Sequence, residues 1–195
     1  MKKALLYIAY TLAYGFWWVM SLLPLWVLYR LSDLLYYVIT YVVRYRHDVI
    51  WNNLSTSFPE KSEAELREIE HQFYHWFCDY LVETVKLMSI SKRQLMQRMT
   101  FTGMEQIHEI LSEGQSIGVY LGHLGNWEWI TSLPYWTSNG LCCQLYHPLE
   151  NEYFDRLFKY VRELHGALCI PMQESLRKII TLSREGKPLI VGYIS

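Results

Sequence analysis

The stretch GHLGNWEW, residues 122–129, places a histidine and a glutamate where they can perform acid–base chemistry. His123 and Glu128 form an H-x4-E pattern. A carboxylate that accepts a hydrogen bond from one imidazole nitrogen leaves the other nitrogen able to take a proton from a hydroxyl. The nucleophile would then come from the substrate. A structural histidine before a helix with an acidic first turn gives the same pattern, because the helix dipole favours an acid there.

Metal binding is a weaker interpretation of the same residues. H-x4-E is not the zinc motif H-E-x-x-H, and two ligands do not complete a site. His147 is the best candidate for a third ligand, and we expect neither a metal nor a cofactor. No C-x-x-C pair is present, so we predict thiols in a reducing compartment, without disulfides, for Cys78, Cys142, Cys143 and Cys169.

From residue 101 onward, apolar strand-like runs alternate with helical patterns. This alternation predicts an α/β fold with a mainly parallel sheet and flanking helices. SIGVYLG (116–122) is an expected strand, so His123 falls at the carboxyl end of a strand, where open α/β sheets bind ligands. Helices should separate the further strands expected at LCCQLY (141–146), ALCIP (167–171) and KPLIVGYIS (187–195). Gly114 and Gly166 should each end a helix.

Small residues around His123 predict a tight turn into a helix. Gly122 and Gly125 permit backbone conformations and close approaches that other residues resist. Asn126 can cap the helix that begins with WEWITSLPYW, which places Glu128 in its first turn. We expect that turn to bring Glu128 back toward the histidine.

The front of the chain has the composition of a membrane anchor. Charged residues make up 19% of the chain, against about 25% in soluble domains, and residues 4–29 carry no charge. That run exceeds the roughly 20 residues needed to cross a bilayer and the 7–15 residues of a signal-peptide core. We predict that residues 1–46 form either one transmembrane helix (4–23), broken at Pro24 and followed by an interfacial helix, or a hairpin.

A helical segment follows the expected anchor. Ser62 and Glu65 have the spacing of a capping box, and the apolar positions after them predict a long amphipathic helix over residues 62–88. Ser91 should cap a short helix over 92–99. Glu83 lies among the apolar residues of the long helix, where it is either a functional group or part of a solvated edge or local ion pair.

Several of these segments together resemble the bacterial lipid A biosynthesis acyltransferases, the late lauroyl and myristoyl transferases of the lysophospholipid acyltransferase-like superfamily. GHLGNWEW is similar to their H-x4-D/E motif. NNLSTSFPEKSEAE (52–65) resembles their N-L-x3-F-P-E-x-S segment, and Glu83 with Lys86 resembles an E-x2-K in their long helix. YHPLENEYFDRLFKYVRELHG (146–166) resembles the stretch after their second strand, so the resemblance spans about residues 2–195.

The resemblance implies an O-acyl transfer. A fatty acyl chain would pass from acyl carrier protein, or from acyl-CoA, to a hydroxyl of a lipid A precursor or related glycolipid. His123 would be the general base and Glu128 the group that orients it. Substrate binding would involve Arg162, as a phosphate ligand or simply a cation at a helix end, the backbone amides of Gly125 and Asn126, and Glu83.

The resemblance also implies a place in the cell and a domain plan. The enzyme would sit in the bacterial inner membrane with its active site facing the cytoplasm, and residues 47–195 would form the acyltransferase domain. A net charge of −1 gives no reason to expect nucleic acid as a partner. Members of the family are longer, and this sequence stops inside an expected strand, so we expect a fragment or a C-terminally truncated product.

Two alternatives remain open at this stage. The first is an acyltransferase for another membrane lipid. Glycerolipid acyltransferases carry their F-P-E segment after the histidine motif, whereas here it precedes the motif at 58–60. The second alternative is a non-catalytic, truncated membrane paralogue, although His123 and Glu128 are both present.

Overall fold

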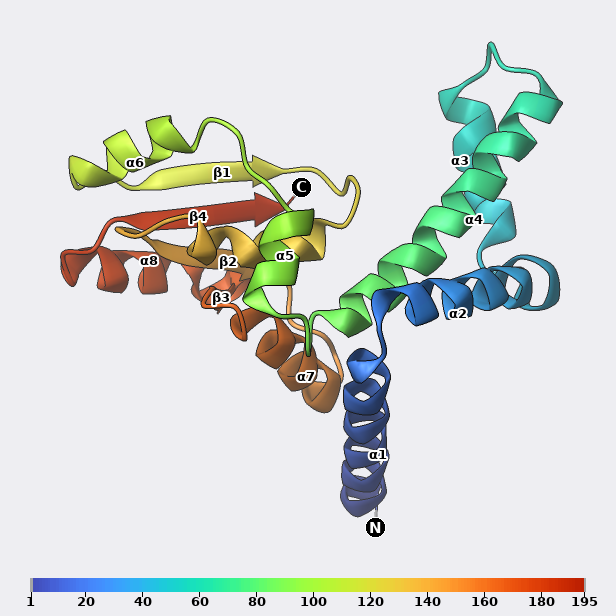
Figure 1. The fold of residues 1–195 in the computed structure, drawn as a ribbon, viewed down its shortest axis with the longest axis horizontal. Coiled ribbons are helices and arrows are strands. Elements are labelled where there is room, and N and C mark those ends of the chain that lie inside the picture. The colour runs from blue at the N-terminus through green and yellow to red at the C-terminus, as the bar shows by residue number, and fades with distance from the viewer. Residues whose placement is uncertain (1, 195) are drawn as a thin grey trace. The chain divides into compact units, whose positions relative to one another are not determined.

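The computed structural model describes the backbone of residues 2–194 and the side chains of residues 6–193 (Figure 1). The chain forms two compact units. One comprises Met1–Ser21 together with Leu87–Ser195, and the other comprises Leu22–Lys86. The expected division into an anchor over 1–46 and an acyltransferase domain over 47–195 is a functional one, and it stays a prediction.

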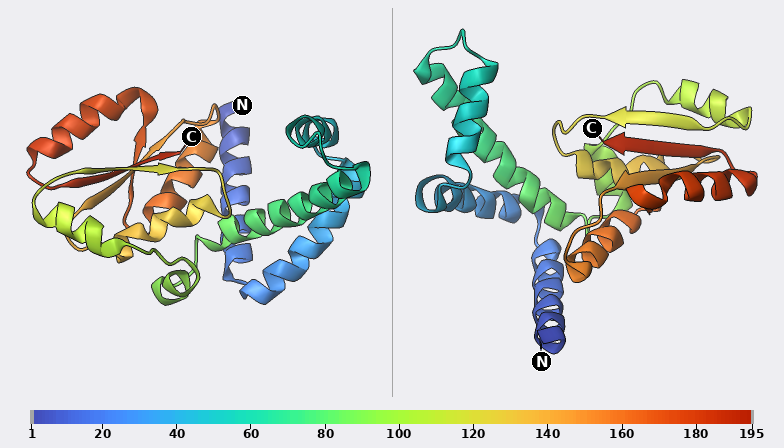
Figure 2. Two further views of the ribbon diagram at one scale, coloured as in Figure 1. Left: turned by 90° about the horizontal axis from the view of Figure 1, so that it is seen from above. Right: turned by 180° about the vertical axis from the view of Figure 1, so that it is seen from behind.

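The larger unit is built on a sheet of four parallel strands. All three strand pairings are parallel, which confirms the predicted α/β class. The strands lie in the order β1 (Ile117–Leu121), β4 (Leu189–Ile194), β2 (Leu141–Tyr146) and β3 (Leu168–Pro171). β4, the last strand in sequence, therefore lies between β1 and β2 (Figures 1 and 2).

Helices cover both faces of this sheet. On one face α6 (Met104–Ser112) and the 3-10 helix η2 (Trp127–Tyr135) contribute to a core that contains Met104, Leu111, Ile130, Leu133, Cys142 and Ile190. On the other face α8 (Ser175–Arg184), which follows the short η3 (Met172–Glu174), buries Leu182 against Cys143, Ile170, Leu189 and Val191. α7 (Glu152–Glu163) joins β2 to β3. The β2–β3 and β3–β4 connections run in opposite directions across the sheet, so right-handed crossovers place α7 and α8 on opposite faces.

Local signals end and begin these helices as expected. Gly114, after α6, and Gly166, after α7, adopt left-handed conformations with φ of 77° and 96°. Ser91 forms a capping box with Gln94 at the start of α5 (Lys92–Arg98), which confirms the predicted cap. The side chain of Asn151 accepts hydrogen bonds from two backbone amides at the start of α7.

The segment after His123 departs from expectation. It is a nine-residue 3-10 helix with Pro134 inside it. Asn126 occupies the N-cap position, but its side chain makes no capping hydrogen bond within the described chain, so that prediction was wrong. Asn126 has φ −91° and ψ 81°, and its side-chain oxygen is buried instead of lying over the first amides of η2.

α1 (Lys2–Leu22) packs against α7 through aromatic rings. Tyr10 lies 5.4 Å from Tyr153 between ring centroids, and Trp17 lies 5.2 Å from Phe158. Apolar side chains elsewhere on α1 are exposed, among them Ile8, Leu12, Phe16 and Val19. α1 thus packs aromatic rings against α7 and leaves other apolar side chains exposed.

Among the described residues, no single helix has both the length and the apolar character needed to cross a bilayer. Leu6–Leu22 and Leu25–Val43 meet that requirement only when taken together as a broken pair. The expected membrane helix therefore stays a prediction.

The smaller unit is helical. Its elements are α2 (Leu25–Tyr37), the π-helix η1 (Val38–Val43), α3 (His47–Ser57) and α4 (Glu63–Lys86). Pro24 separates α1 from α2, which confirms the predicted break. The capping box before α4 is also confirmed, because the Ser62 amide donates to Glu65 Oε2 at 2.9 Å. α4 ends at Lys86, two residues earlier than expected, and α3 was not predicted as a separate helix.

Candidate active site

His123 lies on a tight turn directly beyond β1. The amide of Leu124 donates to the carbonyl of Gly122 at 2.8 Å, and Gly125 follows in the left-handed region with φ of 59°. The turn leaves the His123 side chain exposed to solvent. Its ring meets the Trp127 ring edge to face, with centroids 4.9 Å apart. The sequence prediction of a histidine presented at the carboxyl end of a strand is confirmed.

Glu128 and Arg162 form a bidentate ion pair behind this turn. Arg162 Nε donates to Glu128 Oε2 at 2.7 Å, and Arg162 Nη2 donates to Glu128 Oε1 at 2.6 Å. Glu128 is in the first turn of η2 and its side chain is only 6% exposed, whereas Arg162 is in the last turn of α7 and is 22% exposed. The structure therefore brings together two predicted site residues, one from the histidine motif and one from the 146–166 segment, that no sequence pattern paired.

This ion pair leaves both partners with hydrogen-bonding capacity. Each carboxylate oxygen of Glu128 has two lone pairs, and the guanidinium of Arg162 has five N–H donors. The two bonds between them use one lone pair on each oxygen and two donors. Glu128 can therefore still accept a hydrogen bond from an imidazole. The Phe158 ring lies under the guanidinium, with 5.8 Å from Cζ to the ring centroid.

Gly125 and Asn126 lie between His123 and η2, as the motif requires. A Cβ at Gly125 would meet no atom within 4 Å, so the turn is bordered there by open space. The backbone amides at the start of a helix lack partners within that helix. The open space at Gly125 therefore leaves room for a substrate atom on this turn.

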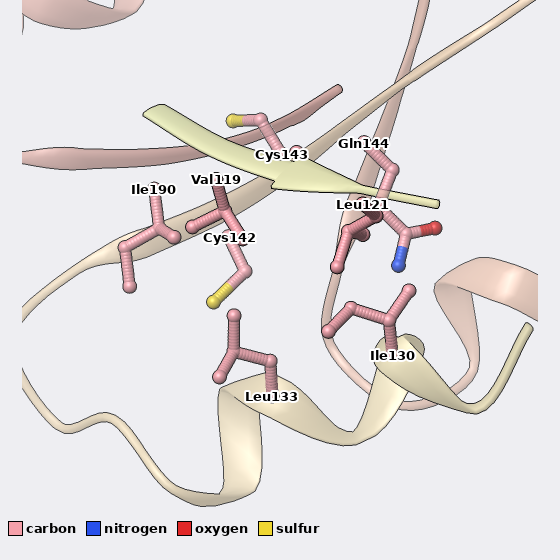
Figure 3. Close-up of a pocket in the computed structure, with 9 residues that line it drawn as sticks. Val119, Leu121, Ile130, Leu133, Cys142, Cys143, Gln144 and Ile190 are labelled. Atoms are coloured by element: carbon pink, nitrogen blue, oxygen red, sulfur yellow. The ribbon is translucent and has the colours of Figure 1, made fainter. Parts of the chain in front are cut away.

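A narrow apolar pocket lies between the sheet and η2, with a cavity volume of about 20 Å³ (Figure 3). Figure 3 shows the Cys142 thiol pointing toward Leu133 on η2. The wall residues come from β1, β2, β4 and η2, and they are Val119, Leu121, Ile130, Leu133, Cys142, Cys143, Gln144, Ile190 and Gly192. Leu121 is the last residue of β1, two positions before His123, so the pocket begins close in sequence to the candidate base.

Glu83 belongs to the smaller unit, where it accepts a hydrogen bond from the Tyr29 hydroxyl at 2.7 Å. Lys86, three residues later, is buried and donates from Nζ to the carbonyl of Leu23 at 2.9 Å. Burial lowers the pKa of this lysine. Lys86 is thus no part of a solvated edge, and the substrate-binding role of Glu83 stays a prediction.

No motif or spacing in the sequence predicted a structural role for His165. This histidine is buried. Its Nδ1 lies 2.9 Å from the Tyr135 hydroxyl, and its Nε2 lies 2.9 Å from the carbonyl of Leu87. A carbonyl only accepts, so the proton is on Nε2 and the tyrosine donates to Nδ1. Burial lowers the pKa of this imidazole. The one local signal for such a role was the position of His165 directly before Gly166, the glycine that ends α7.

The four cysteines are free and buried, which confirms the predicted thiols. Burial raises the pKa of Cys143 to about 11 and that of Cys169 to about 12. Within the described part of the chain, no group of three or more histidine, cysteine, aspartate or glutamate residues could hold a metal ion. The Nδ1 atom of His147 lies 3.0 Å from the Pro148 carbonyl.

The whole chain, residues 1–195, matches the family model described as bacterial lipid A biosynthesis acyltransferase. The chain belongs to this family, and it is an acyltransferase. This confirms the resemblance seen in the histidine motif and the segments on either side of it. No curated protein matches the chain. Membership implies an acyl donor and a lipid acceptor in general terms.

Proposed function

We propose that this enzyme transfers a fatty acyl chain from acyl carrier protein, or from acyl-CoA, to a hydroxyl of a lipid A precursor or related glycolipid. The observation that carries this proposal is the exposed His123 at the end of β1, five residues before a buried Glu128 that Arg162 fixes. The fixed carboxylate gives the turn a stable negative group. The exposed imidazole gives it a base that substrate can reach.

In the proposed reaction His123 takes the proton of the acceptor hydroxyl as its oxygen attacks the thioester carbonyl. The carbonyl oxygen becomes an oxyanion, which the amides of Gly125 and Asn126 would stabilise. Collapse of the tetrahedral intermediate forms the ester bond and breaks the carbon–sulfur bond. The departing thiolate takes the proton from the His123 imidazolium, so the base returns to its neutral form.

Glu128 would accept a hydrogen bond from the second imidazole nitrogen and stabilise the imidazolium. This role needs a carboxylate that does not rotate. The two bonds from Arg162 supply this condition, because a bidentate guanidinium fixes the plane of the carboxylate. We assign Arg162 a positioning role through Glu128. A guanidinium also suits a phosphate of the acceptor.

The apolar pocket between the sheet and η2 would receive the acyl chain. Its walls are hydrocarbon and thiol apart from the Gln144 amide, which suits a saturated chain. Trp129 lies outside this pocket, buried in a core cluster with Leu157 and Val161. The pocket is formed by smaller residues of the strands and of η2.

We further propose that the enzyme works at the bacterial inner membrane with its site facing the cytoplasm. The exposed apolar side chains of α1 support lipid contact. Lys2 and Lys3 before the apolar region, and Arg44 and Arg46 after it, favour the cytoplasmic side for both ends. A helix of this kind would keep the enzyme beside a lipid acceptor that does not leave the membrane.

Acyl transfer in membranes that contain the full chain tests this proposal. Labelled acyl carrier protein is the donor, and a tetra-acylated lipid A precursor is the acceptor. We expect His123→Ala to slow transfer by roughly 10²–10⁴-fold, and the exposed His147→Ala, a matched control, to leave it unchanged. Transfer that survives His123→Ala contradicts the mechanism. Absence of transfer to any glycolipid by the unmodified chain would instead favour a non-catalytic paralogue.

A further inference from the structure

Gly192 leaves a gap in the sheet face that forms the wall of the pocket. Parallel pairing places Gly192 beside Val119 of β1 on one side and beside Gln144 of β2 on the other. All three residues line the pocket. Where the neighbouring strands present side chains, β4 therefore presents only backbone at this level. Glycine inside a strand weakens the strand and often marks a place where a ligand approaches closely.

The register orders the pocket lining into three levels. Leu121, at the end of β1 next to the His123 turn, forms the upper level. Gly192 is at the middle level, and Ile190, which pairs with Cys142, forms the lower level. The distance along the strand from the upper to the lower level is four residues, about 13 Å at the rise of a parallel strand. A chain that enters beside His123 would pass Gly192 before it reaches Ile190.

The glycine is not required by the backbone. Gly192 does not have a positive φ, and a Cβ built on it would lie 3.6 Å from the Cys143 carbonyl oxygen and 4.0 Å from Leu121 Cδ1. Both distances are ordinary van der Waals contacts. An alanine therefore fits here without backbone strain, and a larger side chain would extend into the pocket. The absence of a side chain is consequently a feature of the pocket and not of the fold.

We propose that Gly192 determines which acyl chain lengths the enzyme accepts. A hydrogen at this position gives the chain access to the lower part of the pocket, between Ile190, Cys142 and Leu133. A side chain there would close that part and leave space only for shorter chains. This inference rests on the proposed function, because it takes the pocket to be the acyl site of the transfer reaction.

Competition between donors tests the inference. The full chain is given an equimolar mixture of acyl carrier proteins with long and short saturated chains, and the transferred chains are counted by mass spectrometry. We expect Gly192→Ala to lower the long-to-short ratio, and Gly192→Val to lower it by roughly tenfold or more, because one methylene in an apolar pocket discriminates by that factor.

Gly118→Ala provides a matched control. Gly118 is on β1, next to the pocket residue Val119, so its side-chain position is on the opposite face of the sheet. A Cβ built on Gly118 would lie 3.6 Å from Tyr193 Cε2, the same distance that separates a Cβ on Gly192 from its nearest neighbour. We expect the ratio to stay unchanged in this variant. An unchanged ratio in Gly192→Val, with transfer intact, overturns the proposal for Gly192 and leaves the proposed function standing.

A second measurement does not depend on catalysis. His123→Ala protein is photolysed with a saturated fatty acid that carries a terminal diazirine, and cross-linked peptides are identified by mass spectrometry. We expect adducts on Cys142 or Ile190, and their loss when Gly192→Val is added. If these adducts form but the unmodified chain transfers no acyl group, the proposed function is overturned and the acyl site stands. Absence of adducts at the lower level contradicts the inference itself.

Discussion

Arg162 holds Glu128 through two short hydrogen bonds, from Nε to Oε2 at 2.7 Å and from Nη2 to Oε1 at 2.6 Å. The pair joins the first turn of η2 to the last turn of α7. Glu128 is almost fully buried, so removal of Arg162 would leave a buried carboxylate without its counter-ion. The pair thereby links η2, which follows the His123 turn, to a residue 34 positions beyond Glu128.

Removal of Arg162 should lower both stability and activity. We expect Arg162→Ala to reduce the free energy of unfolding by roughly 3 kcal/mol, because a buried carboxylate would lose its partner. Arg162→Lys should retain part of the stability, yet still lose transfer, because an ammonium cannot form the bidentate contact. Denaturant unfolding and the transfer assay measure the two effects. Arg156→Ala on the exposed side of α7 is the control, and equal losses in both variants would contradict the pairing argument.

Gly125 offers a test of the turn geometry with a close control. Gly125 and Gly186 both have positive φ, 59° and 79°, and both have open space around the Cβ position. Alanine at either position should therefore cost about 1 kcal/mol of stability through backbone strain alone. Only Gly125→Ala should also slow acyl transfer, because it alone alters the turn that carries His123. Transfer that is equally affected in Gly186→Ala would indicate a general loss of folded protein.

His165 should make the larger unit sensitive to acid. Burial lowers the pKa of this imidazole below its ordinary value of 6.5, so the folded state binds the proton less readily than the unfolded state does. Stability should then be fully present above pH 6.5 and decline as the pH falls below it. His165→Gln can still donate to the Leu87 carbonyl and accept from Tyr135, but cannot titrate. Urea titrations should show that the free energy of unfolding of this variant falls less steeply between pH 6.5 and 5 than that of the unmodified chain. An identical fall in both would exclude His165 as the source of the acid sensitivity.

Much of the larger unit could be predicted from sequence because its signals are local. The alternation of apolar runs with helical patterns gave the parallel sheet, and Gly114 and Gly166 gave the ends of two helices. The Ser91 and Ser62 capping boxes also gave helix starts, because each depends on residues three positions apart. His123 was placed correctly for the same reason, since it directly follows a strand.

What could not be predicted depends on contacts between distant segments. The partner of Glu128 is on another helix, and no local pattern pairs the two residues. The gap at Gly192 exists only because β4 inserts between β1 and β2, an order that the sequence does not reveal. Asn126 has the residue type of a helix cap, but its oxygen is buried, which shows that packing prevailed over a local preference.

The most direct test of the account is whether His123 and Glu128 act as one unit. The rate of acyl transfer is measured for His123→Ala, for Glu128→Gln, and for the two changes combined. If Glu128 acts only through the imidazole, the combined variant should be no slower than His123→Ala alone, because residues that act as a unit are non-additive. If the two losses multiply instead, Glu128 serves the reaction independently of His123, and the proposed assembly of base and orienting carboxylate is contradicted.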